Sequence, residues 1–172
     1  MIALWIIAGI IALAFIIALS MPRKHFVKRE IVIHAPVQKV FAYIRFLQNQ
    51  EKFNINAMED ASREKTFKGT DGTAGYIYAW KGNKDAGQGE KEIISIVDGK
   101  SVEMEIRFVK PMKATARIVM ETEPLTGQET KLSWSNSGSL PLPINLFIPT
   151  MQKHVAKDMD KSLIALKAIL EN

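Results

Sequence analysis

The end of the chain, from Pro149 to Asn172, shows a regular pattern of apolar positions. These positions recur every three or four residues, at Met151, Val155, Met159, Leu163, Leu166 and Leu170. This spacing places them on one face of an α-helix. The pattern predicts a long amphipathic helix whose apolar face packs against the rest of the domain. Prolines precede it, and we expect helical residues to begin by Ile144 and Pro149 to kink the helix.

An apolar run opens the sequence, from Ile2 to Leu19, and Ser20 ends it. As a helix this run would be about 28 Å long, close to the hydrocarbon thickness of a bilayer. It predicts a transmembrane anchor over residues 1–20. A cleaved signal peptide is the alternative, because Ala18-Leu19-Ser20 resembles a cleavage site. The anchor is favoured, because the run is longer than a typical signal h-region and no basic residue precedes it.

Basic residues follow the apolar run, at Arg23, Lys24, Lys28 and Arg29. Cytoplasmic flanks of membrane helices carry an excess of lysine and arginine. The distribution therefore predicts a single-pass membrane protein whose C-terminal domain lies in the cytoplasm. We expect residues 21–25 to form a basic juxtamembrane linker next to anionic headgroups.

The next segment changes from strand-like to helix-like periodicity at a proline. Residues 26–34 alternate apolar and polar side chains, which predicts a strand. Pro36 suits the first turn of a helix. Apolar residues then follow at helical spacing, at Val37, Val40, Phe41, Ile44 and Leu47. We expect a strand, a helix, and then a short second helix or a loop near residues 49–56.

From residue 62 onward the apolar pattern has a period of two, and turn residues interrupt it. The pattern predicts six strands, at residues 62–68, 74–81, 88–97, 101–109, 113–123 and 129–137. The turns between them fall at 69–72, 82–87, 98–99, 110–111 and 126–127. Asp98-Gly99 is the strongest hairpin signal, because this dipeptide favours the tight turns that join antiparallel strands.

Alternation within these strands predicts one covered face and one solvent-exposed face. The apolar side carries Val102, Met104, Ile106, Phe108, Ala114, Ala116, Ile118, Met120, Leu132 and Trp134. Glu103, Glu105 and Arg107 point the other way. A seven-stranded antiparallel sheet with one apolar face needs a covering layer, and the C-terminal helix is the long amphipathic element left for it. The predicted fold class is therefore α+β.

Composition and charge narrow the class of protein. The 172 residues leave room for one domain after the apolar run, and 47% hydrophobic with 24% charged residues is ordinary for a folded chain. Cysteine is absent, which excludes disulfides, thiolate metal sites and a cysteine nucleophile. The net charge of +5 does not favour nucleic acid, because the basic residues are interleaved with acidic ones.

No motif of a known catalytic or cofactor site is present. The sequence lacks G-x-S-x-G, H-E-x-x-H, a Walker A loop and a dinucleotide-binding G-x-G-x-x-G. His25, His34 and His154 lie far apart and have no acidic residues at ligand spacing. We therefore expect no metal and no cofactor.

Four short segments resemble the motifs of one protein family. Residues 33–41, IHAPVQKVF, resemble its I-x-A-P-x-x-x-V-F entry, and residues 127–134, GQETKLSW, resemble its G-x-x-T-x-(V/L)-x-W strand. Between them lie GYIYAWKGN at 75–83 and GQGE at 87–90. With the predicted order of elements, these resemble the START-like or SRPBCC superfamily, and within it the polyketide cyclase/dehydrase and lipid-transport branch. The resemblance indicates a START-like domain over residues 26–172.

The resemblance implies a helix-grip fold, in which a curved seven-stranded sheet wraps around the C-terminal helix and encloses a largely apolar cavity. Candidate lining residues are Tyr78, Trp80, Met104, Ile106, Phe108, Ala116, Ile118, Met120, Trp134, Met151, Val155 and Met159. Methionine side chains can repack around a variable apolar guest. The alternative is that these methionines and aromatic residues fill a dry core.

Two polar residues are candidates for contacts with a ligand. Glu90 follows Gly89 at the start of a strand and is the best candidate for an inward carboxylate, although a surface position is the alternative. His154 flanks the apolar stripe of the C-terminal helix, where it would lie at the cavity mouth or serve a structural role. We find no catalytic pair in the sequence.

Three functions fit these observations. The favoured one is a membrane-anchored module, held to the bilayer by residues 2–20, that binds a hydrophobic small molecule or lipid. The second is an enzyme of polyketide cyclase/aromatase or small hydrolase type, which needs polar groups that converge inside the cavity. The third is an interaction or cochaperone-like scaffold without a ligand. Nothing in the sequence indicates an oligomeric state.

Overall fold

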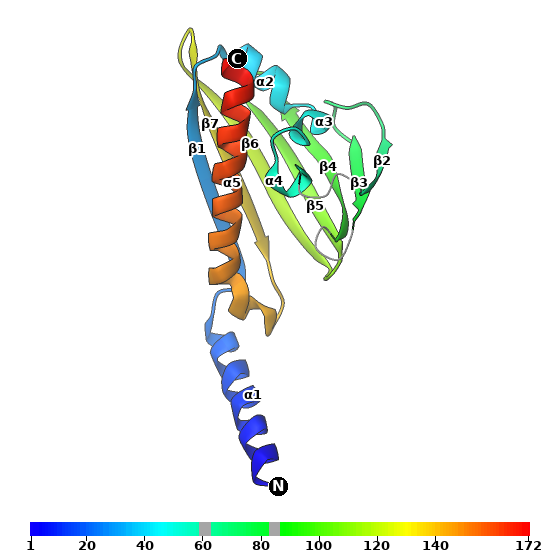
Figure 1. The fold of residues 1–172 in the computed structure, drawn as a ribbon, viewed down its shortest axis with the longest axis vertical. Helices are drawn as coiled ribbons and strands as arrows, with labels where there is room; N and C mark the ends of the chain where they lie inside the picture. The colour runs from blue at the N-terminus through cyan, green and yellow to red at the C-terminus, as the bar shows by residue number, and fades with distance from the viewer. Residues whose placement is uncertain (59–62, 83–86) are drawn as a thin grey trace.

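The computed structural model describes residues 1–58, 63–82 and 87–172 (Figure 1). The first residue of the strand predicted at 62–68, and most of the turn predicted at 82–87, lie outside these ranges. The helices are α1 (Ile2–Ser20), α2 (Val37–Ile44), α3 (Leu47–Gln50), α4 (Ile55–Met58), the 3-10 helix η1 (Ile144–Phe147) and α5 (Ile148–Glu171). The strands are β1 (Lys24–Ile33), β2 (Glu64–Lys68), β3 (Ile77–Lys81), β4 (Gln88–Val97), β5 (Ser101–Lys110), β6 (Ala114–Thr126) and β7 (Glu129–Ser139).

The seven strands form one antiparallel sheet in the order β1-β7-β6-β5-β4-β3-β2. The predicted hairpin at Asp98-Gly99 joins β4 to β5, and Gly99 has a φ of 68°, which glycine adopts without strain. β3 begins at Ile77, later than predicted, because residues 74 and 75 lie in a turn in which Gly75 takes a φ of 84°. The predicted seven-stranded antiparallel sheet is confirmed.

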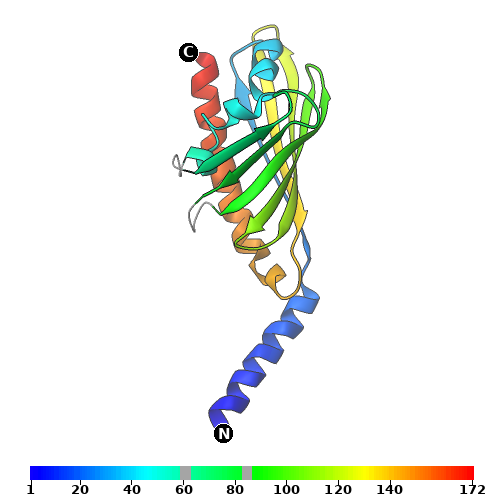
Figure 2. The same cartoon turned by 90° about the vertical axis from the view of Figure 1, so that its right-hand side faces the viewer.

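The long C-terminal helix α5 lies along the sheet beside β1 (Figures 1 and 2). Its buried face contains Met159, Leu163, Leu166 and Leu170, as the apolar spacing predicted. Pro149 lies in the first turn of α5 instead of kinking the helix, because the 3-10 helix η1 ends just before it. At that position the missing proline N–H removes no helical hydrogen bond.

The apolar core lies between the sheet and the helices. Val102 and Met104 of β5 are fully buried on the inner face, and Ile106 is nearly so. The short helix α2 adds Val40 and Ile44 to the same core. Helices therefore cover one face of the sheet, and the other face is left to charged residues.

The N-terminal helix α1 extends away from the domain (Figure 1). It is long and apolar enough to cross a membrane, and almost all of it is exposed. A signal sequence near an N-terminus has the same properties. At its end, Ala18 is fully buried, and the Asn145 side chain donates from Nδ2 to the Ala18 carbonyl at 2.7 Å and to the Met21 carbonyl at 3.2 Å. Asn145 thus ties the end of α1 to η1.

Candidate ligand-binding cavity

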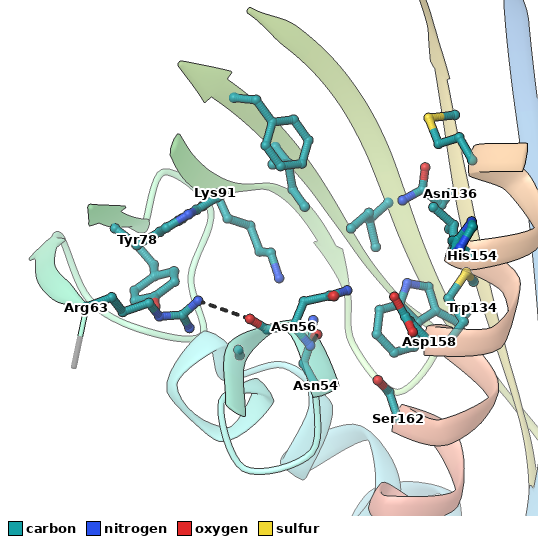
Figure 3. A pocket seen from close by; sticks show the side chains of 18 residues that line it. Asn54, Asn56, Arg63, Tyr78, Lys91, Trp134, Asn136, His154, Asp158 and Ser162 are labelled. Atoms are coloured by element: carbon teal, nitrogen blue, oxygen red, sulfur yellow. Dashed lines mark hydrogen bonds between the residues drawn. The ribbon is translucent and has the colours of Figure 1, made fainter. Parts of the chain in front are cut away.

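A cavity of about 570 Å³ lies between the sheet and α5 (Figure 3). Its aromatic and aliphatic lining consists of Ala57, Tyr78, Trp80, Ile106, Phe108, Ile118, Trp134, Met151, Val155 and Met159. Its polar lining consists of Asn54, Asn56, Arg63, Lys91, Asn136, His154, Asp158 and Ser162. The cavity therefore combines a broad apolar wall with a set of polar groups.

Most of the apolar residues singled out in the sequence lie along this cavity. Met104, Ala116 and Met120 do not. Met104 and Met120 are fully buried on the same face of the sheet, and the Met104 sulfur accepts a hydrogen bond from Gln50 of α3 at 3.2 Å. These two methionines fill the core, as the dry-core alternative described, because α3 covers the sheet at Met104 and α2 packs on β6.

The aromatic part of the wall is a row of rings on β3 and β5. The Tyr78 and Trp80 rings stack with centroids 5.9 Å apart, and Phe108 meets Trp80 edge-on at 6.1 Å. Gly89 makes room for this row, because a Cβ there would lie 2.8 Å from Cζ2 of Trp80. Gly89, in the GQGE motif, therefore leaves the space on β4 that the Trp80 indole occupies.

Glu90 lies on the opposite face of the sheet from the cavity. It faces Arg107 across β4 and β5, and Nε of Arg107 donates to its carboxylate at 2.6 Å. Arg107 also bonds Glu92 at 2.6 Å and Glu105 at 2.7 Å. The expectation of an inward Glu90 is therefore wrong, because alternation along β4 turns Gly89, Lys91 and Ile93 inward and leaves Glu90 outside. Glu105 and Arg107 lie on the solvent-exposed face, as predicted.

His154 lies at the edge of the cavity on the exposed side of α5. Its Nδ1 is 2.8 Å from the Thr150 carbonyl, one turn earlier in the helix. Asp158 and Ser162 lie one and two turns further along α5 and also line the cavity, and Ser162 is buried. Their helical spacing from Met151 and Val155 was a signal in the sequence for this polar edge.

Lys91 was not among the site residues predicted from the sequence, and it adds a buried cation to the cavity. Its side chain points into the cavity from β4, it is 8% exposed, and its Nζ donates to Gln50 Oε1 at 3.0 Å. Burial, together with the nearby Arg63 guanidinium, lowers the pKa of Lys91 to about 8. The phase of β4 was the signal, because Lys91 lies two residues before the buried Ile93.

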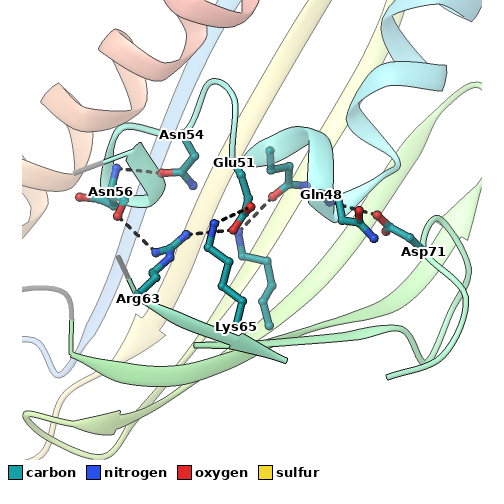
Figure 4. A network of polar contacts seen from close by, with 9 residues as sticks. Gln48, Glu51, Asn54, Asn56, Arg63, Lys65 and Asp71 are labelled. Carbon is teal, nitrogen blue, oxygen red and sulfur yellow. Dashed lines mark hydrogen bonds and ion pairs between the residues drawn. The ribbon is translucent and has the colours of Figure 1, made fainter. Parts of the chain in front are cut away.

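A second cation, Arg63, lines the cavity next to an ion-pair cluster (Figures 3 and 4). Its guanidinium lies 3.3 Å from Glu51 Oε1 and 5.5 Å from the centroid of the Tyr78 ring. Lys65 binds the other oxygen of Glu51 at 2.9 Å. Burial would raise the pKa of Glu51, but Lys65 and Arg63 hold it below its ordinary value. Burial, followed by the neighbouring Glu51 carboxylate, raises the pKa of Tyr78.

Three polar atoms beside the cavity have no hydrogen-bond partner in the described part of the chain. They are Nε1 of Trp134, Nε of Arg63 and the hydroxyl of Tyr78, and all three are buried. Buried donors in folded proteins usually have an acceptor, from the protein, from water or from a ligand. Among residues 1–58, 63–82 and 87–172, no group of three or more histidine, cysteine, aspartate or glutamate side chains is arranged to hold a metal ion.

The sequence of this chain matches a protein family, and its structure resembles several solved structures. The sequence model of the family described as polyketide cyclase / dehydrase and lipid transport matches residues 24–171. No curated protein matches the chain.

Solved structures with the same fold share little sequence with this chain. Protein CV1439 from Chromobacterium violaceum is 15% identical with a TM-score of 0.61, over 86% of this chain and 97% of its own. The Zhui aromatase/cyclase from Streptomyces sp. R1128 is 10% identical with a TM-score of 0.64, over 86% and 94%. The Aha1 dimer from Colwellia psychrerythraea is 15% identical with a TM-score of 0.58, over 86% and 96%. At these identities the neighbours establish the fold alone.

Proposed function

The chain belongs to the polyketide cyclase/dehydrase and lipid transport family, and from this premise we propose that it is a membrane-anchored module that binds a hydrophobic small molecule or lipid. The observation that carries this proposal is the cavity of about 570 Å³ with its aromatic and aliphatic wall. Small-molecule sites are typically apolar cavities of about 300–1,000 Å³ with a few polar groups. The family match also confirms the resemblance drawn from the sequence motifs.

The anchor is supported by α1 and by its junction with the domain. α1 has the length and apolarity of a membrane span, and Asn145 bonds its last turn to η1. The domain would then lie next to the bilayer, where amphiphiles are concentrated. Residues 1–20 would form the anchor, 21–25 the basic linker and 26–172 the binding domain.

A bound amphiphile should co-purify with the protein. We would extract the full chain in mild detergent, remove free lipid, and identify bound molecules by native mass spectrometry and solvent extraction. Val155→Trp fills the cavity from α5 and should reduce the bound fraction at least ten-fold with little change in Tm. Ile164→Trp on the exposed side of the same helix is the matched control and should retain the amphiphile.

The outcome distinguishes binding from a scaffold. If no amphiphile co-purifies and none can be loaded, the binding proposal fails and the scaffold hypothesis replaces it. If Val155→Trp retains the amphiphile as well as Ile164→Trp does, the ligand lies elsewhere.

A cyclase-type enzyme is a second candidate, and Lys91 is the observation that favours it. A group with a pKa of about 8 inside a cavity can exchange protons near neutral pH. Incubation of the protein with linear poly-β-keto thioesters, followed by mass spectrometry, should then yield cyclised products. Binding of these compounds without turnover would leave the binding module as the function.

A further inference from the structure

We propose that the ligand of this cavity is an amphiphile with an anionic head group, a carboxylate or a phosphate, and that Lys91 and Arg63 bind the head. This rests on the proposed function, since it assigns the chemistry of the ligand that the cavity would take. Three features of the cavity support it: the excess of cations, the unpartnered hydrogen-bond donors, and the position of the apolar wall.

Positive charge is in excess at the end of the cavity near β3 and β4. Lys91 and Arg63 both line the cavity, and each is about nine-tenths buried or more. The carboxylate beside them, Glu51, is shared by Arg63 and Lys65. Among the described residues at this end, three cations therefore stand against one carboxylate, an excess of two positive charges. An anionic head would neutralise this excess.

Lys91 itself lacks a carboxylate partner. Its hydrogen bond goes to the neutral amide of Gln50, and no carboxylate in the described ranges forms an ion pair with it. Asp158 lies on the other side of the cavity, on α5 (Figure 3). A buried ammonium without a counter-charge is costly, and the lowered pKa of Lys91 reflects that cost. A bound anion would supply the missing charge and raise this pKa again.

The unpartnered polar atoms of the cavity point to the same chemistry. At the end of the cavity near Lys91, Arg63 Nε is a donor and the Tyr78 hydroxyl can donate, and neither has a hydrogen-bond partner among the residues that the structure describes. Carboxylate and phosphate groups offer several acceptor oxygens and no donor when ionised. A neutral alcohol or ester head would satisfy fewer of these donors and leave the ammonium uncompensated.

The apolar wall sets the orientation of the ligand. Ile118 and Trp134 on the sheet, with Val155 and Met159 on α5, form a surface suited to a hydrocarbon or ring system. Asp158 on α5 would repel an anion, so the head is directed toward Lys91 and the apolar part toward α5.

The test compares amphiphiles that share a tail and differ in the head. The full chain in mild detergent is titrated by native mass spectrometry with dodecanoic acid, dodecyl phosphate and dodecanol. The wild type should bind the two anionic compounds at least ten-fold more tightly than dodecanol. Lys91→Met, which keeps the length and apolar volume of the side chain, should lose this preference and bind dodecanol as before. Lys68→Met removes an exposed charge from β2 and should leave the preference intact.

A pH series on the wild type gives a second measurement that needs no substitution. Affinity for dodecyl phosphate should fall at least five-fold between pH 7 and pH 9.5, as Lys91 loses its proton, and affinity for dodecanol should stay constant. Arg63, Lys65, Glu51, Tyr78, Asp158 and His154 also face Lys91 or the cavity. The same series on Lys91→Met measures their contribution and should be flat.

The possible results separate the two proposals. If none of the three compounds binds, the proposed function fails and this inference with it. If all three bind the wild type equally, the cavity binds amphiphiles but the anionic head is excluded. If Lys91→Met keeps the preference and the pH dependence, Lys91 does not bind the head.

Discussion

Lys91 points into the cavity because it lies on the same side of β4 as the buried Ile93. Its burial makes the free energy of unfolding depend on pH. The unfolded chain holds this proton up to a pKa of about 10.5, whereas the folded protein releases it near pH 8. Between these values the unfolded state binds more protons, so stability rises with pH in this window. The energetic cost of the buried charge is thus fully present below pH 8.

Lys91→Met should therefore stabilise the protein at pH 7 by up to about 3 kcal/mol, because the pKa of Lys91 falls from 10.5 to about 8 on folding and each pKa unit is worth about 1.4 kcal/mol. Urea unfolding at pH 7 and at pH 9.5 measures this. The gain should shrink at pH 9.5, because the wild type has by then lost most of the charge. A variant that is less stable than the wild type at both pH values would show that the ammonium is compensated by groups not identified above.

Arg107 is the centre of the outer-face network with Glu90, Glu92 and Glu105. Replacing it with Met leaves three neighbouring carboxylates without a cation. The groups are partly exposed and screened by solvent, so we expect a loss of roughly 1 kcal/mol in unfolding free energy. The loss should be smaller in 1 M NaCl than in 50 mM NaCl. Arg117→Met, which breaks a single pair with Glu103, should cost less.

At the scale of elements, the junction between α1 and η1 controls how α1 is held against the domain. Asn145 is fully buried and donates to the carbonyls of Ala18 and Met21. Leucine has nearly the same size but no donor, so Asn145→Leu should release α1 without unfolding the sheet. Electron spin resonance between labels at Ile7→Cys and Ile164→Cys should show a broader distance distribution in this variant.

The absence of native cysteine makes this measurement direct, because the two introduced cysteines are the only labelling sites. Asn172→Leu, at the exposed end of α5, serves as the control and should leave the distribution unchanged. An unchanged distribution in Asn145→Leu would mean that packing around Ala18 holds the helix instead.

At the scale of the whole molecule, the charge distribution around α1 predicts the side of the membrane on which the domain lies. Arg23, Lys24, Lys28 and Arg29 favour the cytoplasm. A single cysteine at Asn172→Cys should therefore resist a membrane-impermeant maleimide in intact cells and react after lysis. Labelling of intact cells would reverse the predicted orientation, and release of the domain into a soluble fraction would favour the signal peptide.

The strands, the long helix and the family could be predicted because their signals are local. Alternation along β5 and β6 and the helical spacing along α5 follow from backbone geometry, so each side chain could be assigned to a face before any contact was known. The family resemblance then indicated a cavity lined by Tyr78, Trp80, Trp134 and Val155, and these residues lie along the cavity of the structure. These features were determined by the sequence itself.

The polar end of the cavity was decided by the tertiary structure. Glu90 and Lys91 are neighbours in β4, so alternation sends them to opposite faces, but only the pairing with β5 brings Arg107 to Glu90 and only the packing of α3 brings Gln50 to Lys91. Arg63 reaches the cavity because β2 pairs at the sheet edge beside Tyr78, a long-range contact without a local signal. Met104 and Met120 were on the predicted face, yet packing under the helices made them core. Periodicity thus determines which way a side chain points, whereas the packing of distant elements determines what it meets there.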